Sequence, residues 1–168
     1  MSESVVKDSK TLKRARTKMK ELGIPLPEKG DPKAHVSWPG NVGDLSSEEI
    51  AQHMTWWTAW SGFVRYELAE VETNVAALTA ELELVKGEAM HKSEGDYKTV
   101  TELKAAVAQM SSVQTAEAMV LEASATKRML KALLVGYEEK YQTISREVSR
   151  RQGDREEANS GNSRRFQR

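Results

Sequence analysis

Basic side chains gather in three clusters, and these are the residues in the sequence best suited to bind an anion. Proteins that bind single-stranded nucleic acids follow the phosphates with such groups, and their affinity falls steeply with salt. We therefore interpret the clusters as candidate nucleic-acid contacts. They comprise Lys13, Arg14, Arg16 and Lys18 near the N-terminus, Lys127, Arg128 and Lys131 in the second half, and Arg146, Arg150 and Arg151 near the C-terminus.

Each terminal cluster has an alternative interpretation. The cations near the C-terminus equally fit a solvated helix flank, in which Arg146 and Arg150 pair with Glu147 or with acidic groups of a partner. The N-terminal cations are hardly offset by acidic residues, which favours a nucleic acid, but they equally fit docking on an acidic protein.

An aromatic cluster at residues 56–66 holds three of the four tryptophans. At helical spacing Trp56, Trp60 and Phe63 share one face, whereas Trp57 falls on the apolar seam described below. Such rings can stack on unpaired bases. Because few cations accompany them, we favour an aromatic core or a subunit contact.

Catalytic and metal-binding patterns are not found in this sequence. The three histidines, His35, His53 and His91, lack the spacing of metal ligands, and no phosphate-binding glycine loop or HExxH motif occurs. The chain has no cysteine, which excludes disulfides, thiolate metal sites and cysteine nucleophiles. We predict that the protein is not an enzyme and needs no cofactor or metal.

The formal net charge of zero is a cancellation between parts of the chain. The 168 residues contain 25 basic and 25 acidic side chains. Residues 1–22 carry a net charge of +4 and residues 146–168 carry +3, which leaves −7 for the middle. Two basic ends therefore flank an acidic body, and the balance does not exclude a nucleic-acid partner.

Two long helices are expected between residues 46 and 152. Ser46 and Glu49 form the pattern of a capping box, and Leu45 with Ile50 forms a hydrophobic staple. A 3.5-residue apolar period then predicts a coiled-coil seam to about residue 92. Gly95 suits the break, after which a second helix is predicted over 97–152 and ended by Gly153. The positions of the seam in the first helix are Ile50, Met54, Trp57, Ser61, Val64, Leu68, Val71, Val75, Leu78, Leu82, Val85 and Ala89.

The predicted fold is all-α, a long antiparallel helical hairpin resembling a coiled coil. Its parts are a basic arm at 1–22, in which residues 10–22 form a short helix, a proline- and glycine-rich linker at 23–45, the hairpin at 46–152 and a disordered tail at 153–168. Since two helices bury only one narrow seam, we expect a homo-oligomer that covers the outer apolar rows. These rows include Trp56, Trp60, Phe63, Met129 and Leu133. No apolar run is long enough for a membrane helix, and we expect no membrane partner.

The layout resembles a family of small recombination proteins from tailed phages, the UvsY-type recombination mediators. The resemblance covers about residues 46–152 and depends on the tryptophan-centred helix start at 53–60 and on the helix end at 129–151. It implies an oligomeric, all-helical accessory protein that binds single-stranded DNA. Such a protein also contacts a single-strand-binding protein and helps a RecA-like recombinase to load on the DNA. If the chain is a phage protein, the host cytoplasm is its expected location.

One segment departs from the family. In that family the DNA-contacting basic residues lie late in the first long helix. The corresponding residues 78–86 of this chain contain only one cation, Lys86. Any DNA site is therefore expected in the basic arm and at 146–151. Two other function classes remain open, namely a capsid-scaffold-like assembly protein with a basic docking end, and an inhibitor of a host defence factor.

Overall fold

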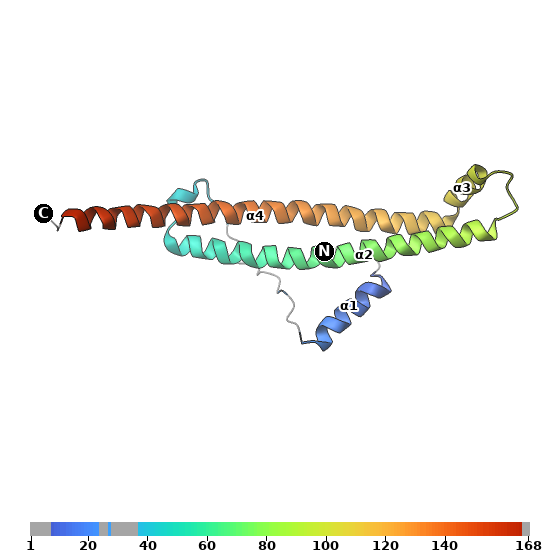
Figure 1. Ribbon diagram of the computed structural model, residues 1–168, viewed down its shortest axis with the longest axis horizontal. Coiled ribbons are helices and arrows are strands. Elements are labelled where there is room, and N and C mark those ends of the chain that lie inside the picture. Colours follow the sequence, from blue (N-terminus) through green and yellow to red (C-terminus); the bar gives the residue numbers. More distant parts are fainter. Residues whose placement is uncertain (1–7, 24–26, 28–36, 166–168) are drawn as a thin grey trace. The chain divides into compact units, whose positions relative to one another are not determined.

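The computed structural model describes residues 8–23, 27 and 37–165, and the side chains of these residues up to 158. Within this part of the chain every regular element is helical, which confirms the all-α class (Figure 1). None of the described helices contains an apolar stretch sufficient to cross a bilayer. The elements are α1 (Lys10–Glu21), the short 3₁₀ helix η2 (Val42–Asp44), α2 (Ser47–Lys92), α3 (Val100–Ala108) and α4 (Ser111–Arg165).

The chain divides into two compact units, and the two longest helices contribute to both. Unit 1 comprises residues 1–26 and 66–131, so it contains α1, the second part of α2, α3 and the first part of α4. Unit 2 comprises residues 27–65 and 132–168, with η2, the start of α2 and the remainder of α4. Most of the expected linker, including His35, lies outside the described residues.

The start of α2 has the predicted capping box. The Ser46 backbone N–H donates to Glu49 Oε2 at 2.7 Å, and the Glu49 N–H donates to Ser46 Oγ at 3.2 Å. Leu45 packs against the buried cluster that includes Ile50, as the staple requires. The boundary of α2 was therefore readable from local chemistry.

Each unit has a small apolar core on the predicted seam. Ile50, Trp57 and Ile144 are buried together in unit 2, and Leu82, Ala89, Val107 and Val113 are buried in unit 1. All twelve seam positions of α2 are buried or half-buried. The predicted period therefore identifies the packed face of this helix.

Ion pairs show how the helix segments run in unit 1. Glu72 on α2 contacts Lys127 and Lys131 on α4, each at 3.2 Å, while Lys86 further along α2 contacts Glu117 at 2.9 Å. Residue numbers rise along α2 as they fall along α4. The two segments in this unit are therefore antiparallel.

The expected continuous helix over 97–152 is wrong. A capping box between Thr99 and Glu102 starts α3, and Gln109 and Met110 separate α3 from α4. Val107 and Val113 flank this break and are both buried in the core of unit 1. In one straight helix they would point roughly 120° apart. The break lets both side chains enter the same core.

The expected helix end at Gly153 is also wrong, because α4 continues to Arg165 through the segment predicted to be a disordered tail. Arg150 pairs with Asp154 at 2.7 Å across this glycine and with Glu147 at 2.8 Å. Such pairs stabilise a helix by a few tenths of a kcal/mol each, and an interior glycine costs only about 0.5–1 kcal/mol relative to alanine. The turn after α2 does use the predicted glycine, since Gly95 has φ 98°.

A Gly153→Ala substitution should stabilise this end of α4 by about 0.5–1 kcal/mol, because Gly153 is helical and no atom would clash with the added Cβ. Amide exchange at residues 150–158 should slow accordingly. The matched variant Gly95→Ala should destabilise its turn by about 1–2 kcal/mol, since its φ is positive. Faster exchange in Gly153→Ala would contradict a helix through this position.

Candidate nucleic-acid interface

α1 is a short, strongly basic helix. Its twelve residues contain six Lys or Arg and one acidic residue. Ser9 caps the start, since its Oγ accepts a hydrogen bond from the Leu12 N–H at 3.2 Å. Lys18 and Lys20 lie in the last turn, where cations favour the negative end of the helix dipole. The predicted helix over 10–22 is therefore confirmed to within one residue.

The N-terminal half of α1 is docked on α2 within unit 1. Leu12 is the buried side chain of α1. One turn earlier, the Ser9 backbone N–H donates to Asn74 Oδ1 at 2.8 Å, and Asn74 is only 3% exposed. A buried amide oxygen needs such a donor, since leaving it unsatisfied costs roughly 1–3 kcal/mol. This contact therefore fixes where α1 begins on α2.

A partly buried ion pair forms the second anchor of α1. Arg16 donates from Nε to Glu70 Oε1 at 2.7 Å and from Nη2 to Glu70 Oε2 at 2.6 Å. This is the bidentate geometry that the planar guanidinium favours. Arg16 also pairs with Asp8, and the Tyr66 hydroxyl donates to Glu70 Oε1. Arg16, predicted from the sequence to contact nucleic acid, therefore holds α1 on the protein.

The ion pair shifts the protonation equilibria around it. The hydrogen bonds from Arg16 lower the pKa of Glu70, against the opposing effect of burial. The same bonds raise the pKa of Arg16. Burial, followed by the hydrogen bond to Glu70, raises the pKa of Tyr66. The carboxylate is thus held ionised beside a permanent cation.

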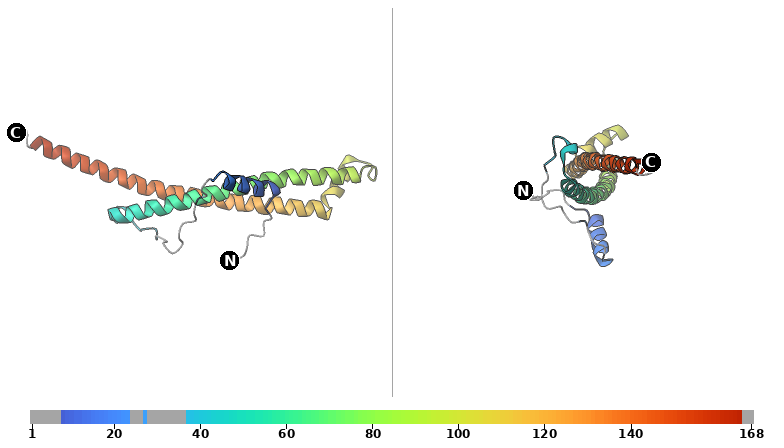
Figure 2. Two further views of the ribbon diagram at one scale, coloured as in Figure 1. Left: turned by 90° about the horizontal axis from the view of Figure 1, so that it is seen from below. Right: turned by 90° about the vertical axis from the view of Figure 1, so that its left-hand side faces the viewer.

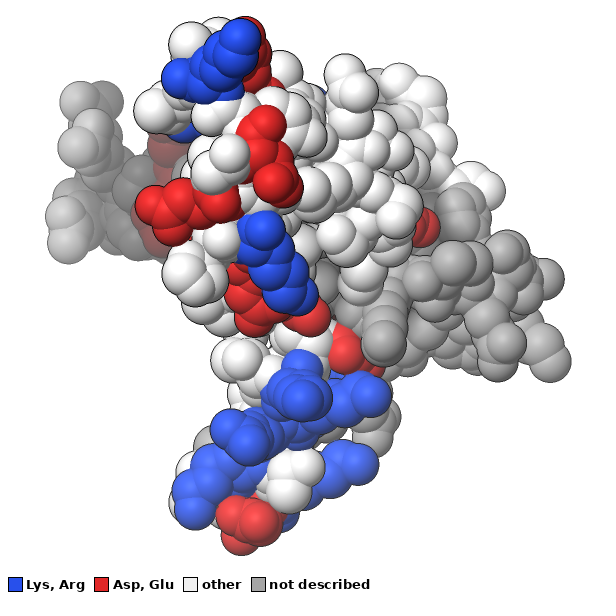
Figure 3. All heavy atoms as spheres, turned by 90° about the vertical axis from the view of Figure 1, so that its right-hand side faces the viewer, with Lys and Arg blue, Asp and Glu red and all other residues white. Residues whose placement is uncertain are grey.

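The surface of α1 outside the Leu12 and Arg16 contacts presents cations to solvent. Lys10, Lys13, Arg14 and Lys20 are exposed and form no ion pair with any other described residue, whereas Lys18 lies 3.4 Å from Glu21. The second half of α1 projects away from the long helices of its unit (Figure 2). Figure 3 shows the Lys and Arg side chains gathered over α1, with acidic side chains on the adjoining part of the unit. We call Lys10, Lys13, Arg14 and Lys20 the outer cations of α1.

The C-terminal basic cluster is mostly neutralised by its own helix. Glu147 accepts from Arg150 at 2.8 Å and from Arg151 at 2.6 Å, and these bonds lower the pKa of Glu147 to about 2. Arg151 also donates to the backbone oxygen of Leu45 at 2.6 Å. Arg150 and Arg151 are therefore paired with an acidic residue of their own helix, which is the alternative interpretation given above for this cluster. Arg146 is exposed and has no ion pair among the described residues.

The middle basic cluster is divided in the same way. Lys127 and Lys131 share Glu72, and this pair of contacts lowers the pKa of the Glu72 carboxyl. Arg128 does not share this contact, since it is exposed and has no ion pair among the described residues. Two of the three cations of this cluster are therefore engaged within unit 1.

The aromatic cluster lies in unit 2 and has a core at Trp57, which is 3% exposed. Its ring meets Trp56 edge-on at 4.3 Å between centroids and lies 5.3 Å from Tyr137. Trp60 and Phe63 are half-buried and continue the row, with centroids 6.0 Å apart. Trp57 is therefore a core residue and offers no open surface on which a base could stack.

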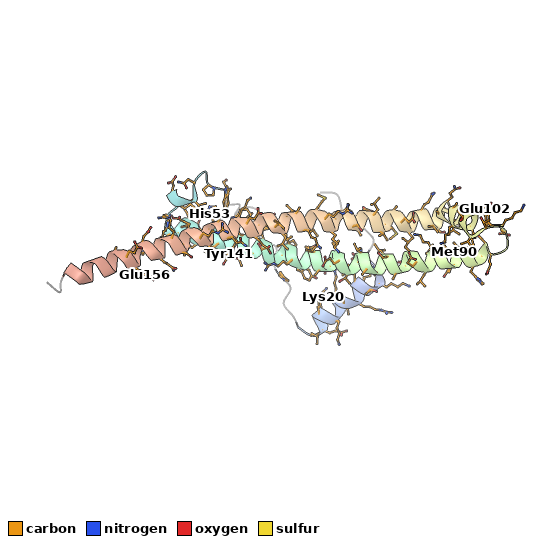
Figure 4. The ribbon with its side chains drawn as sticks, turned by 45° about the horizontal axis from the view of Figure 1, so that its top comes forward. Lys20, His53, Met90, Glu102, Tyr141 and Glu156 are labelled. Atoms are coloured by element: carbon orange, nitrogen blue, oxygen red, sulfur yellow. The ribbon has the colours of Figure 1, made fainter. Side chains whose placement is uncertain are left out.

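Two members of this cluster were missed in the sequence. Lys140 Nζ lies 4.4 Å from the Trp57 ring centroid, a cation–π contact, and Trp38 meets the same ring at 6.1 Å. Trp38 lies among the prolines of the expected linker, directly before Pro39, and Lys140 follows two glutamates. Neither residue therefore belongs to an apolar repeat. Figure 4 labels Tyr141, the next residue of α4, and His53 on α2 of the same unit.

His53 is buried against this cluster. It is 2% exposed, and burial lowers its pKa, so the neutral imidazole is favoured. Trp38 packs edge-on against the ring at 6.3 Å. No group of three or more His, Asp or Glu residues in the described part of the chain is arranged to hold a metal ion.

Glu70 and Asn74 are residues of the candidate site that sequence reasoning missed altogether. They lie four residues apart on α2, next to the apolar seam, so they share the face that receives α1. A polar pair at this spacing beside a seam is a usable signal for a docked third helix. In a helix this rich in glutamate, however, the signal does not single out Glu70.

Comparison with protein families, with curated proteins and with solved structures finds no match to this chain.

A Glu70→Ala substitution should loosen α1, because it removes the two α2 oxygens that accept hydrogen bonds from Arg16 and the acceptor of Tyr66. Charge-assisted hydrogen bonds contribute about 1.5–3 kcal/mol, so amide exchange in residues 12–21 should accelerate by roughly 30-fold. Glu88→Ala, which removes an exposed carboxylate of the same helix, is the matched control. Unchanged exchange in α1 of the Glu70 variant would show that the ion pair is not the anchor.

Proposed function

We propose that this protein is a non-enzymatic accessory factor that binds single-stranded DNA through the outer cations of α1. The observation that supports the proposal is the contrast among the basic clusters. The cations of α1 at positions 10, 13, 14 and 20 lack ion-pair partners among the described residues, whereas Arg150, Arg151, Lys127 and Lys131 are engaged. Unneutralised cations are the groups that release counterions from a phosphate backbone.

The charges of unit 1 confine a nucleic acid to α1. Residues 66–131 contain eleven acidic and seven basic residues, so this part of the unit repels phosphates. Along α1, Lys10 and Arg14 are one turn apart, a step of about 6 Å along the axis. Lys13 and Lys20 form a neighbouring row two turns long. A backbone lying across these rows meets several cations at once.

The mode of binding should be independent of sequence. The outer face of α1 offers ammonium and guanidinium groups, and the segment 10–21 contains no aromatic residue that would stack on a base. Such contacts go to phosphates and carry no base information directly. The preference for a single strand, and a role in loading a RecA-like recombinase onto DNA covered by a single-strand-binding protein, come from the resemblance to UvsY-type mediators.

We further propose that α2 and α4 form one coiled-coil-like antiparallel hairpin and that this hairpin self-associates. In unit 2, Arg151 donates to the Leu45 oxygen just before α2, and Arg65 contacts Glu138, so α2 and α4 are antiparallel there. Unit 1 has the same sense, since Glu72 contacts Lys127 and Lys86 contacts Glu117. Exposed apolar side chains remain on α4, including Leu121 and Met129. Surfaces of this kind usually become interfaces.

Replacing Lys10, Lys13 and Arg14 by Ala should weaken binding to labelled single-stranded DNA at least about tenfold at low salt and reduce the slope of log K against log salt by up to about 2. The matched control replaces Lys92, Lys98 and Lys104, which are exposed residues of the same unit, by Ala. It removes the same charge and should leave the affinity within about twofold.

Equal losses in the two triple variants would mean that net charge, and not α1, governs binding. Absence of binding by the unmodified chain at low salt would contradict the proposed function. In that case an acidic protein surface becomes the partner of α1, and an acidic peptide titrated against the same variants would identify it.

A further inference from the structure

The outer face of α4 in unit 1 carries an apolar stripe that no described residue covers. Leu121 and Met129 are 70% and 69% exposed. Ala125, which lies between them in the sequence, and Ala118, which precedes Leu121, are also exposed. These four residues recur at steps of three and four, so they line one side of the helix. Ala123, which is fully buried, lies on the other side. The stripe is therefore separate from the seam that α4 shares with α2.

The residues around Ala125 have a two-fold pattern along the sequence. Leu121 precedes Ala125 by four residues and Met129 follows it by four. Glu122 precedes it by three residues and Arg128 follows it by three. Both charged side chains are exposed and have no ion pair among the described residues. The positions that are symmetric about Ala125 are therefore two apolar residues, Leu121 and Met129, and an acidic and a basic residue, Glu122 and Arg128.

We infer that a second copy of this chain docks antiparallel on this stripe, with the two-fold axis passing beside Ala125. A two-fold interface requires that residue i contacts residue j and that j contacts i. With the axis at Ala125, Leu121 of each copy lies opposite Met129 of the other, and Glu122 lies opposite Arg128. The small alanine at the centre lets the helices approach closely.

Other arrangements of the same stripe lack this complementarity. A parallel pairing in register would place Glu122 beside Glu122 and Arg128 beside Arg128, and like charges at such distances oppose association. The inference deepens the self-association proposed above by naming its face and its register. It does not depend on DNA binding, because the outer cations of α1 take no part in it.

Charge reversal provides the sharpest test. Glu122→Arg alone and Arg128→Glu alone each replace two attractive pairs by two repulsive ones, so each variant should dissociate at a concentration at least about tenfold higher than the unmodified chain. An equimolar mixture of the two variants has only attractive pairs and should associate as tightly as the unmodified chain. Sedimentation equilibrium measures all of these masses.

Either of two results would overturn the inference. One is an unmodified chain that stays monomeric at the highest concentration reached, and the other is a mixture that associates no better than its components. Leu121→Asp and Leu84→Asp form a matched pair, since both leucines are 70% exposed. Only the Leu121 variant should lose association, and an equal effect of the two would place the interface elsewhere.

Cross-linking tests the register directly, because the chain has no cysteine of its own. Ala125→Cys should form an intermolecular disulfide on oxidation. Ala118→Cys should not, since the two introduced thiols would lie about 21 Å apart along antiparallel helices. Equal cross-linking of both variants would contradict the antiparallel register. Titration of single-stranded DNA against the Leu121 variant reports separately on the function proposed for α1.

Discussion

A buried carboxylate on α2 is the constraint on which the placement of α1 depends. Burial of Glu70 opposes its ionisation, and Arg16 offsets this effect with two hydrogen bonds together with a permanent charge. Asn74, one turn along, needs the Ser9 N–H for the same reason. These two polar contacts determine which face of α1 turns inward. The apolar contribution of α1 is small, since Leu12 is its buried residue.

The same arrangement determines what α1 presents outward. One of its six cations is used as the anchor, and four of the others are left exposed with no ion-pair partner among the described residues. Four cations of the other two clusters are neutralised locally, Arg150 and Arg151 by Glu147, and Lys127 and Lys131 by Glu72. Clusters with a similar number of basic residues thus differ in how many of these residues are paired. The difference depends on the acidic residues within reach and not on the number of cations.

Local signals in the sequence predicted the elements well, and tertiary effects account for the errors. The Ser46–Glu49 capping box and the turn at Gly95 involve neighbours in the chain, so both were readable. The break at Gln109 arises because Val107 and Val113 share one core, and α4 passes Gly153. The role of Glu70 depends on a residue 54 positions away, and no periodicity encodes that contact. The sequence does not reveal the partner of Arg16, whereas the pairing of Arg150 with Glu147 is one of the two interpretations that it allows for the C-terminal cluster.

The central claim is that the outer face of α1 is the surface that meets the nucleic acid. Chemical labelling of lysines in the full chain, with and without excess single-stranded DNA at low salt, tests it directly. The account predicts that DNA protects Lys10, Lys13 and Lys20, while the exposed Lys92, Lys98 and Lys104 of the same unit react equally in both samples. Protection of those three lysines with none on α1 would contradict it.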